Sequence, residues 1–192
     1  GERLGLIGPN GSGKTTMINC ISGALINDEG SVLFEDQEIK ALSAHKRARL
    51  GIARSFQIPK PFKSMTVLEN LCVPLEYAAR DRAGHRHIYN QAMEVLQTIG
   101  FAGRAHDLSA DLTQVDLRKL ELARAMAAKP TLLISDEAMA GLSSSEVDQI
   151  LEILLNLSEQ GVAIIMIEHI MRAVMRFSHR IVVLDAGHKI AE

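Results

Sequence analysis

Apolar runs of strand length recur along the 192-residue sequence, and helical patterns separate them. Four of these runs lack the polar alternation of a half-exposed strand, so they predict parallel strands that are covered on both faces. The runs are residues 3–7, 131–135, 162–167 and 180–184. This pattern predicts an α/β fold with a mostly parallel sheet.

Helix signals occupy the segments between the runs. Residues 14–24 predict a helix directly after the first strand. Its apolar side is expected to consist of Met17, Ile21 and Ala24. Ser143 and Glu146 have capping-box spacing, and the apolar stripe that follows them stops at Gly161. That second helix lies between two predicted strands, so it is expected to be a βαβ crossover.

The middle of the chain predicts helices without strands. Residues 64–108 contain no good strand pattern. Thr66 and Glu69 have capping-box spacing, and residues 88–99 carry apolar side chains at helical intervals. Residues 80–87 between them are polar and turn-like.

These patterns suggest how the chain is organised. Residues 30–39 predict a short antiparallel ribbon that is broken at residues 36–37. We expect a helical subdomain over residues 58–109, inserted into a RecA-like core that is formed by residues 1–57 and 110–192.

Composition narrows the class of protein. With 47% hydrophobic residues, 23% charged residues and a net charge of −2, the chain is globular and has no overall attraction for nucleic acid. The basic residues 45–49 are read as a solvated helix face. Cys20 and Cys72 are far apart, which fits a reducing compartment and no metal site. The longest fully apolar stretch, residues 162–167, is too short to span a bilayer.

One motif carries a chemical mechanism. Residues 8–15 spell G-x-x-x-x-G-K-T directly after the first predicted strand and open the first predicted helix. Such a loop turns its amides and the helix N-terminus toward phosphate, while Lys14 reaches the outer phosphates and Thr15 binds Mg²⁺. A glycine-rich hairpin that binds nothing is the alternative. The residues predicted to contact ATP are Gly8, Pro9, Asn10, Gly11, Ser12, Gly13, Lys14, Thr15 and Thr16.

Two acidic residues follow the second apolar run. Asp136 stands at the expected carboxyl end of a strand, where a carboxylate can hold Mg²⁺ near the phosphate loop. The adjacent Glu137 is expected to point elsewhere and to polarise the attacking water. A surface pair that caps the next turn is the alternative.

Three weaker signals accompany these motifs. His169 follows the next apolar run and could contact the γ-phosphate or the water, although a lone histidine is more often structural. Gln57 follows a short apolar stretch where the helical insertion begins, and could contact Mg²⁺. Thr113 is a plausible N-cap with Asp116 at capping-box spacing, which is also how an ordinary helix begins.

Taken in this order, the motifs resemble the nucleotide-binding domain of ABC transporters over essentially the whole chain. Residues 8–15 correspond to Walker A and residues 131–137 to Walker B with the catalytic glutamate. Gln57 and His169 fall at the Q-loop and H-loop positions, and residues 139–143 fit the D-loop. Three segments look most like the ATP-binding subunits of branched-chain amino-acid importers, namely residues 53–57, 140–142 and 167–175.

The resemblance implies a function and partners. Such a subunit hydrolyses ATP with Mg²⁺, which Thr15, Gln57 and Asp136 would hold. Glu137, His169 and Gln57 would serve hydrolysis. It works as a homo- or heterodimer with a second ATP-binding subunit and docks on transmembrane permease subunits, here near residues 57–62. It would be cytoplasmic and peripheral on the inner face of the cell membrane, with no nucleic acid as partner.

The chain departs from the family pattern at the signature loop. The usual L-S-G-G-Q is Leu-Thr-Gln-Val-Asp at residues 112–116. Thr113 keeps the hydroxyl that is expected to reach the partner subunit's nucleotide. Val115 restricts close approach of the backbone to phosphate, and Asp116 adds a negative charge unless it caps its own helix. We therefore expect a slow or silent composite site. Ala138 replaces the usual proline with small effect.

Two other function classes stay open at this point. One is a soluble ABC ATPase of DNA repair, chromosome cohesion or translation. The other is an ATP-binding regulatory subunit with a degenerate signature loop. We also expect the sequence to be a core excerpt, because the family's adenine-stacking aromatic lies upstream of Walker A and no such segment precedes Gly1.

Overall fold

The computed structural model describes residues 1–55, 59–77 and 85–192, with only the backbone of residues 85 and 86. Its main sheet has six strands in the order β4-β5-β6-β1-β7-β8. The first five are parallel, and β8 pairs antiparallel with β7. The strands are β1 (Arg3–Ile7), β4 (Ile52–Ser55), β5 (Leu132–Asp136), β6 (Ala163–Ile167), β7 (Arg180–Asp185) and β8 (His188–Ala191).

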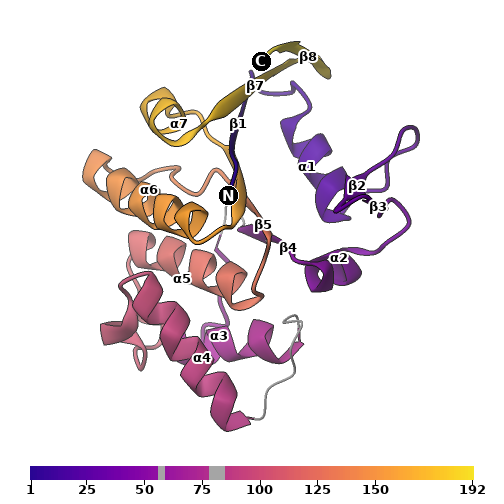
Figure 1. Cartoon of the computed structure of the whole chain (residues 1–192). Coiled ribbons are helices and arrows are strands. Elements are labelled where there is room, and N and C mark those ends of the chain that lie inside the picture. The colour runs from indigo at the N-terminus through magenta and orange to yellow at the C-terminus, as the bar shows by residue number, and fades with distance from the viewer. Residues whose placement is uncertain (56–58, 78–84) are drawn as a thin grey trace.

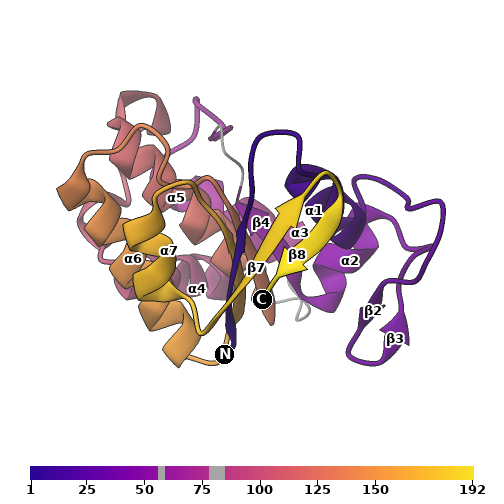
Figure 2. The same cartoon turned by 90° about the horizontal axis from the view of Figure 1, so that it is seen from above.

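Helices cover both faces of this sheet, as Figures 1 and 2 show. One face carries α1 (Lys14–Ser22), α2 (Ala44–Leu50) and the small ribbon of β2 (Leu33–Phe34) and β3 (Gln37–Glu38). The other carries α5 (Gln114–Ala127), α6 (Ser144–Glu159) and α7 (Met171–Phe177). Each face has its own hydrophobic core cluster.

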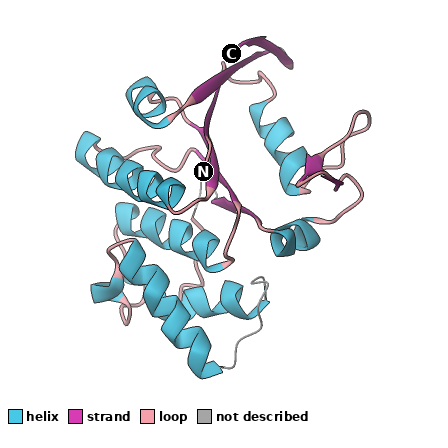
Figure 3. Cartoon of the chain, viewed as in Figure 1, coloured by secondary structure: helices cyan, strands magenta, loops and turns pink. Residues whose placement is uncertain are grey.

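Two further helices pack on α5, on the side away from the sheet. These are α3 (Val67–Tyr77) and α4 (His85–Thr98), which also contact each other. Figure 3 shows that this part of the described chain is built from helices and loops. None of the helices in the described ranges combines the length and the apolar character that crossing a bilayer requires.

The register of the parallel strands brings their carboxyl ends to one edge. Leu6 and Asp136 are both paired with Ile167, which ends β6. Ser55, the last residue of β4, is paired with Ser135. The segments that follow these four strands therefore begin side by side. Asp136 ends β5 at this edge, and Glu137 and the phosphate-loop residues follow directly after β5 and β1.

The predicted sheet, ribbon and crossover helix are confirmed. Ser143 and Glu146 form the predicted capping box at the start of α6, and Gly161 has a φ of 99° after its end. At α3, the Thr66 amide donates to the Glu69 carboxylate at 2.8 Å, and the Glu69 amide donates to the Thr66 hydroxyl at 3.2 Å. Local capping chemistry thus places these helix starts correctly.

Other details were predicted wrongly. Helix α1 ends at Ser22, because Gly23 leaves it in the left-handed conformation, and its buried apolar residue is Ile18 rather than the exposed Met17. The ribbon turns at Glu35 and Asp36, which have positive φ, and Gln37 already belongs to β3. Helix α4 begins at His85, inside the segment predicted as a turn. Strands β4 and β8 were not predicted.

Candidate functional site

The phosphate-loop motif folds into a tight loop between β1 and α1. Gly8, Gly11 and Gly13 all have positive φ, of 151°, 79° and 97°. A Cβ at Gly8 would lie 2.1 Å from the Leu184 carbonyl oxygen, so only glycine fits there. The loop is also tied to the β7–β8 turn, because the Gly187 amide donates to the Ser12 carbonyl at 3.1 Å. This curled backbone is the type that turns successive amides toward an anion.

Lys14 lies inside this loop rather than out in solvent. Its Nζ donates to the carbonyl oxygens of Gly8 at 2.7 Å and Pro9 at 2.9 Å, and the residue is buried. The ammonium group is therefore held at the centre of the loop, where a phosphate ligand would gain a fixed positive charge.

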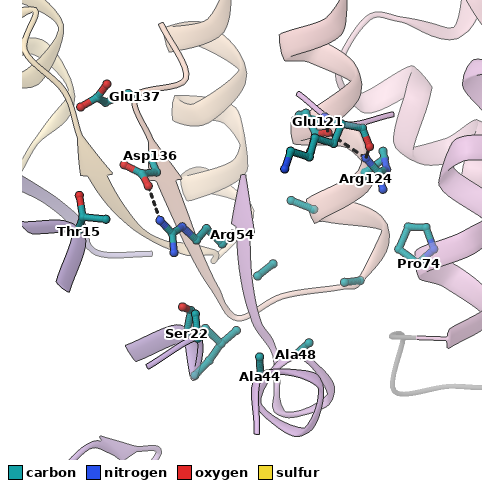
Figure 4. Close-up of a pocket in the computed structure, with 16 residues that line it drawn as sticks. Thr15, Ser22, Ala44, Ala48, Arg54, Pro74, Glu121, Arg124, Asp136 and Glu137 are labelled. Atoms are coloured by element: carbon teal, nitrogen blue, oxygen red, sulfur yellow. Dashed lines mark hydrogen bonds and ion pairs between the residues drawn. The ribbon is translucent and has the colours of Figure 1, made fainter. Parts of the chain in front are cut away.

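Thr15 and Asp136 line one cavity of about 700 Å³, together with Glu137 (Figure 4). Thr15 comes from the first turn of α1 and Asp136 from the end of β5. The Asp136 carboxylate is buried and accepts a hydrogen bond from the Arg54 Nη2 at 2.5 Å. Arg54 lies on β4, and its Nη1 donates to the Asn19 side chain at 2.7 Å.

Glu137 and His169 meet above the ends of β5 and β6. Glu137 has a φ of 48°, and its amide donates to the Ile167 carbonyl at 2.9 Å, which fixes the residue just past the strand. Its carboxylate oxygen lies 2.9 Å from the His169 Nε2. As predicted from the sequence, Glu137 and Asp136 point in different directions (Figure 4).

A further acidic residue, which the sequence analysis did not single out, supports this edge from inside. Glu168 is buried, and its carboxylate accepts the Met139 amide at 2.9 Å. Burial raises the pKa of Glu168 to about 6, against the effect of the Met139 hydrogen bond. The sequence signal that could have identified Glu168 is its position directly after the apolar run of β6.

Gln57 lies outside the described residues, so its predicted position near Mg²⁺ stays a prediction. The chain that follows it is held by α5. The Lys60 amide donates to the Glu121 carboxylate at 2.8 Å, while Arg124 donates to the Lys60 carbonyl at 3.0 Å and lies 5.2 Å from the centre of the Phe62 ring. Phe62 itself is 42% exposed.

The variant signature loop forms the first turn of α5. Thr113 is its N-cap, as predicted, and accepts the Asp116 amide at 3.3 Å. The Thr113 hydroxyl donates to the Asp116 carboxylate at 2.6 Å, and Arg104 forms an ion pair with the same carboxylate. Val115 packs partly buried against the core cluster. Asp116 therefore faces its own helix and a cation.

These groups converge at one sheet edge. A positive-φ glycine loop centred on a lysine, together with an acidic residue at the same end of another parallel strand of the sheet, defines a P-loop nucleoside triphosphatase. Residues 1–140 match the model of the family described as ABC transporter. The chain belongs to that family, whose ATP-binding subunits are ATPases.

Relatives with curated names agree with this assignment. The probable branched-chain amino acid transport ATP-binding protein LivG of Archaeoglobus fulgidus is 38% identical over 196 residues, covering 97% of this chain and 76% of the relative. LivG of Escherichia coli K12 is 34% identical over 203 residues, covering 99% and 80%. The methionine import ATP-binding protein MetN of Bartonella henselae is 34% identical over 197 residues, covering 100% and 56%.

Solved structures with the same fold are also ABC cassettes. The ADP conformation of the cassette MJ1267 matches with a TM-score of 0.90 at 30% identity, covering 99% of this chain and 79% of the other. The dimeric post-hydrolysis cassette MJ0796, bound to ADP and Pi, matches with a TM-score of 0.86 at 26% identity, covering 99% and 84%.

Proposed function

We propose that this chain binds ATP with Mg²⁺ at the edge described above and hydrolyses it to drive import of branched-chain amino acids. The observation that carries the proposal is the convergence of the Lys14 loop, Asp136 and the Glu137–His169 pair on neighbouring strand ends. The solute is inferred from the printed names of the LivG relatives.

The donors in the cavity suit a magnesium ion. A threonine hydroxyl and a carboxylate are hard oxygen ligands, and Mg²⁺ is usually held by one or two such groups together with phosphate and water. We infer that Thr15 and Asp136 hold Mg²⁺, with Gln57 as a third candidate. When bound, the ion would neutralise charge that develops on the phosphates.

The remaining steps belong to the chain's own residues. Lys14 and the backbone amides of residues 8 and 10–16 would bind the phosphates, and the positive charge of Lys14 would strengthen those contacts. Glu137 would accept hydrogen bonds from the attacking water and orient it. The contact between His169 and Glu137 would fix the carboxylate in that orientation, so catalysis rests on positioning and electrostatics.

We further infer that residues 58–109 act as the helical subdomain and that two ATP-binding subunits pair, with Thr113 facing the partner's nucleotide. Dimeric cassettes among the solved structures support this pairing. We also infer that a permease docks near residues 57–62, on the cytoplasmic face of the membrane. The exposed ring of Phe62 and the hydrogen bond from the Lys60 amide to Glu121 of α5 support this proposal.

An uptake experiment tests the function. In the cells that make this protein, the gene is replaced by one that encodes Glu137→Gln. Uptake of labelled leucine, isoleucine and valine should fall to background, while methionine uptake should be unchanged. Selective loss of methionine uptake, or normal uptake of all four, would reject the assigned solute. Association of the purified protein with DNA or ribosomes instead of membranes would reject transport.

A further inference from the structure

Arg54 connects three elements around the proposed metal site. From β4, its guanidinium bonds Asp136 at the end of β5 and Asn19 on α1, at 2.5 and 2.7 Å. Asn19 stands one helical turn after Thr15, so both side chains belong to the same side of α1. Figure 4 shows Arg54 pointing at Asp136, and Thr15 lines the same cavity as these two residues.

The pair is largely removed from water. The side chains of Arg54 and Asp136 are 13% and 11% exposed. A carboxylate in such a position is costly unless a cation compensates it, and removing the cation leaves an unpaired charge. Arg54 therefore compensates the negative charge of Asp136 within the folded chain.

A metal ion at Thr15 and Asp136 would bind the same carboxylate that forms the ion pair with Arg54. Two cations near one carboxylate repel each other, and the repulsion is strong in a partly dry cavity. We propose that Arg54 is a built-in counter-ion of Asp136 that competes with Mg²⁺, an inference that rests on the proposed function. Arg54 is thus a positioning residue that lowers the affinity of the site for Mg²⁺ and stabilises the chain before the metal binds.

The test measures Mg²⁺ binding and stability instead of turnover. Binding of a fluorescent ADP analogue to the purified protein is followed during a Mg²⁺ titration, and thermal unfolding is recorded in EDTA. Arg54→Gln should lower the half-saturating Mg²⁺ concentration by about tenfold. It should also lower the Tm in EDTA by roughly a few degrees. Arg54→Lys keeps the positive charge and should stay within about threefold of the wild type.

Two further variants make the result specific. In an Asp136→Asn background, Arg54→Gln should no longer change the Mg²⁺ dependence, because the shared carboxylate is gone. Arg180→Gln is the control, since Arg180 also forms ion pairs with two carboxylates, those of Glu2 and Glu192. Arg180 is the first residue of β7, so it lies at the end of the sheet where the parallel strands begin, away from the proposed metal site. It should leave the Mg²⁺ dependence unchanged.

The outcomes separate this inference from the proposed function. Arg54→Gln could leave the half-saturating Mg²⁺ concentration unchanged or raise it, while Asp136→Asn abolishes the Mg²⁺ dependence of nucleotide binding. In that case the counter-ion role is wrong and the metal site stands. If nucleotide binding by the wild type does not depend on Mg²⁺, the proposed metal site itself is wrong.

Discussion

The Thr113 hydroxyl donates to the Asp116 carboxylate at 2.6 Å within the first turn of α5. Arg104, twelve residues earlier, forms an ion pair with the same carboxylate and a second with Asp107 at 2.6 Å. The Asp116 side chain is only 13% exposed. The negative charge that stood out in the sequence is thus covered by a hydroxyl and a cation.

The first prediction concerns this charge. Arg104→Gln should weaken ATP-driven dimerisation and hydrolysis several-fold, because it uncovers the Asp116 carboxylate on the loop that is proposed to face the partner's nucleotide. Asp116→Asn added to Arg104→Gln should restore both. ATPase assays measure hydrolysis by the variants. Sedimentation of the same variants combined with Glu137→Gln measures ATP-driven dimerisation. A single Arg104→Gln variant with normal dimerisation would show that the charge is irrelevant.

The second prediction concerns the Glu137–His169 contact. Each single change, Glu137→Gln and His169→Ala, should lower kcat by roughly 10²–10⁴-fold while ATP still binds. Because the two side chains lie 2.9 Å apart, the double variant should be hardly slower than Glu137→Gln alone. Steady-state kinetics on the four proteins checks this, and fully multiplicative losses would mean that the residues act separately.

The third prediction compares two glycines of the phosphate loop. Gly8→Ala should unfold the protein more readily and abolish ATP binding, because the new Cβ would meet backbone at 2.1 Å. Gly11→Ala meets nothing within 4 Å, so its cost should be limited to the strain of a positive φ, roughly 1–2 kcal/mol. Urea unfolding compares the two variants. Equal destabilisation would contradict the steric argument.

The fourth prediction is a pH dependence of stability from Glu168. Its carboxyl is buried near Glu137, His169 and Arg118. Because the folded pKa of about 6 lies above the reference value of 4.5, the neutral form stabilises the fold below pH 4.5. That stability is lost as the pH rises through 6, by about 2 kcal/mol.

Comparison with Glu168→Gln isolates this effect. The difference in free energy of unfolding between the variant and the wild type should grow in favour of the variant from pH 4.5 to 6.5, and then level off. Urea titrations at several pH values measure it. A difference that does not change with pH would exclude a raised pKa for Glu168.

Much of the fold followed from local physical rules. Apolar runs predicted the parallel strands that are buried on both faces, and Ser–Glu or Thr–Glu spacings predicted the starts of α6 and α3. Strand β8 escaped because all four of its residues are exposed, so it has no apolar run. The buried side of α1 was misjudged, because Ile18 rather than its neighbour Met17 packs into the core.

The candidate site was predictable where one motif holds all the parts. Residues 8–15 and Asp136 with Glu137 were recognised because their chemistry is local in sequence. The Arg54–Asp136 and Arg104–Asp116 pairs were not, because each depends on elements that only the tertiary fold brings together. The contact of Arg54 with Asp136 could be predicted only once residues 52–55 were known to form a strand beside β5.

The most direct test of the central claim is calorimetric titration of ATP, with and without Mg²⁺, into the wild type and a Lys14→Ala variant. We expect saturable binding to the wild type that strengthens with Mg²⁺ and is lost or greatly weakened in Lys14→Ala. Absence of binding to the folded wild type, or equal binding to both proteins, would contradict the assignment of this sheet edge as an ATP site.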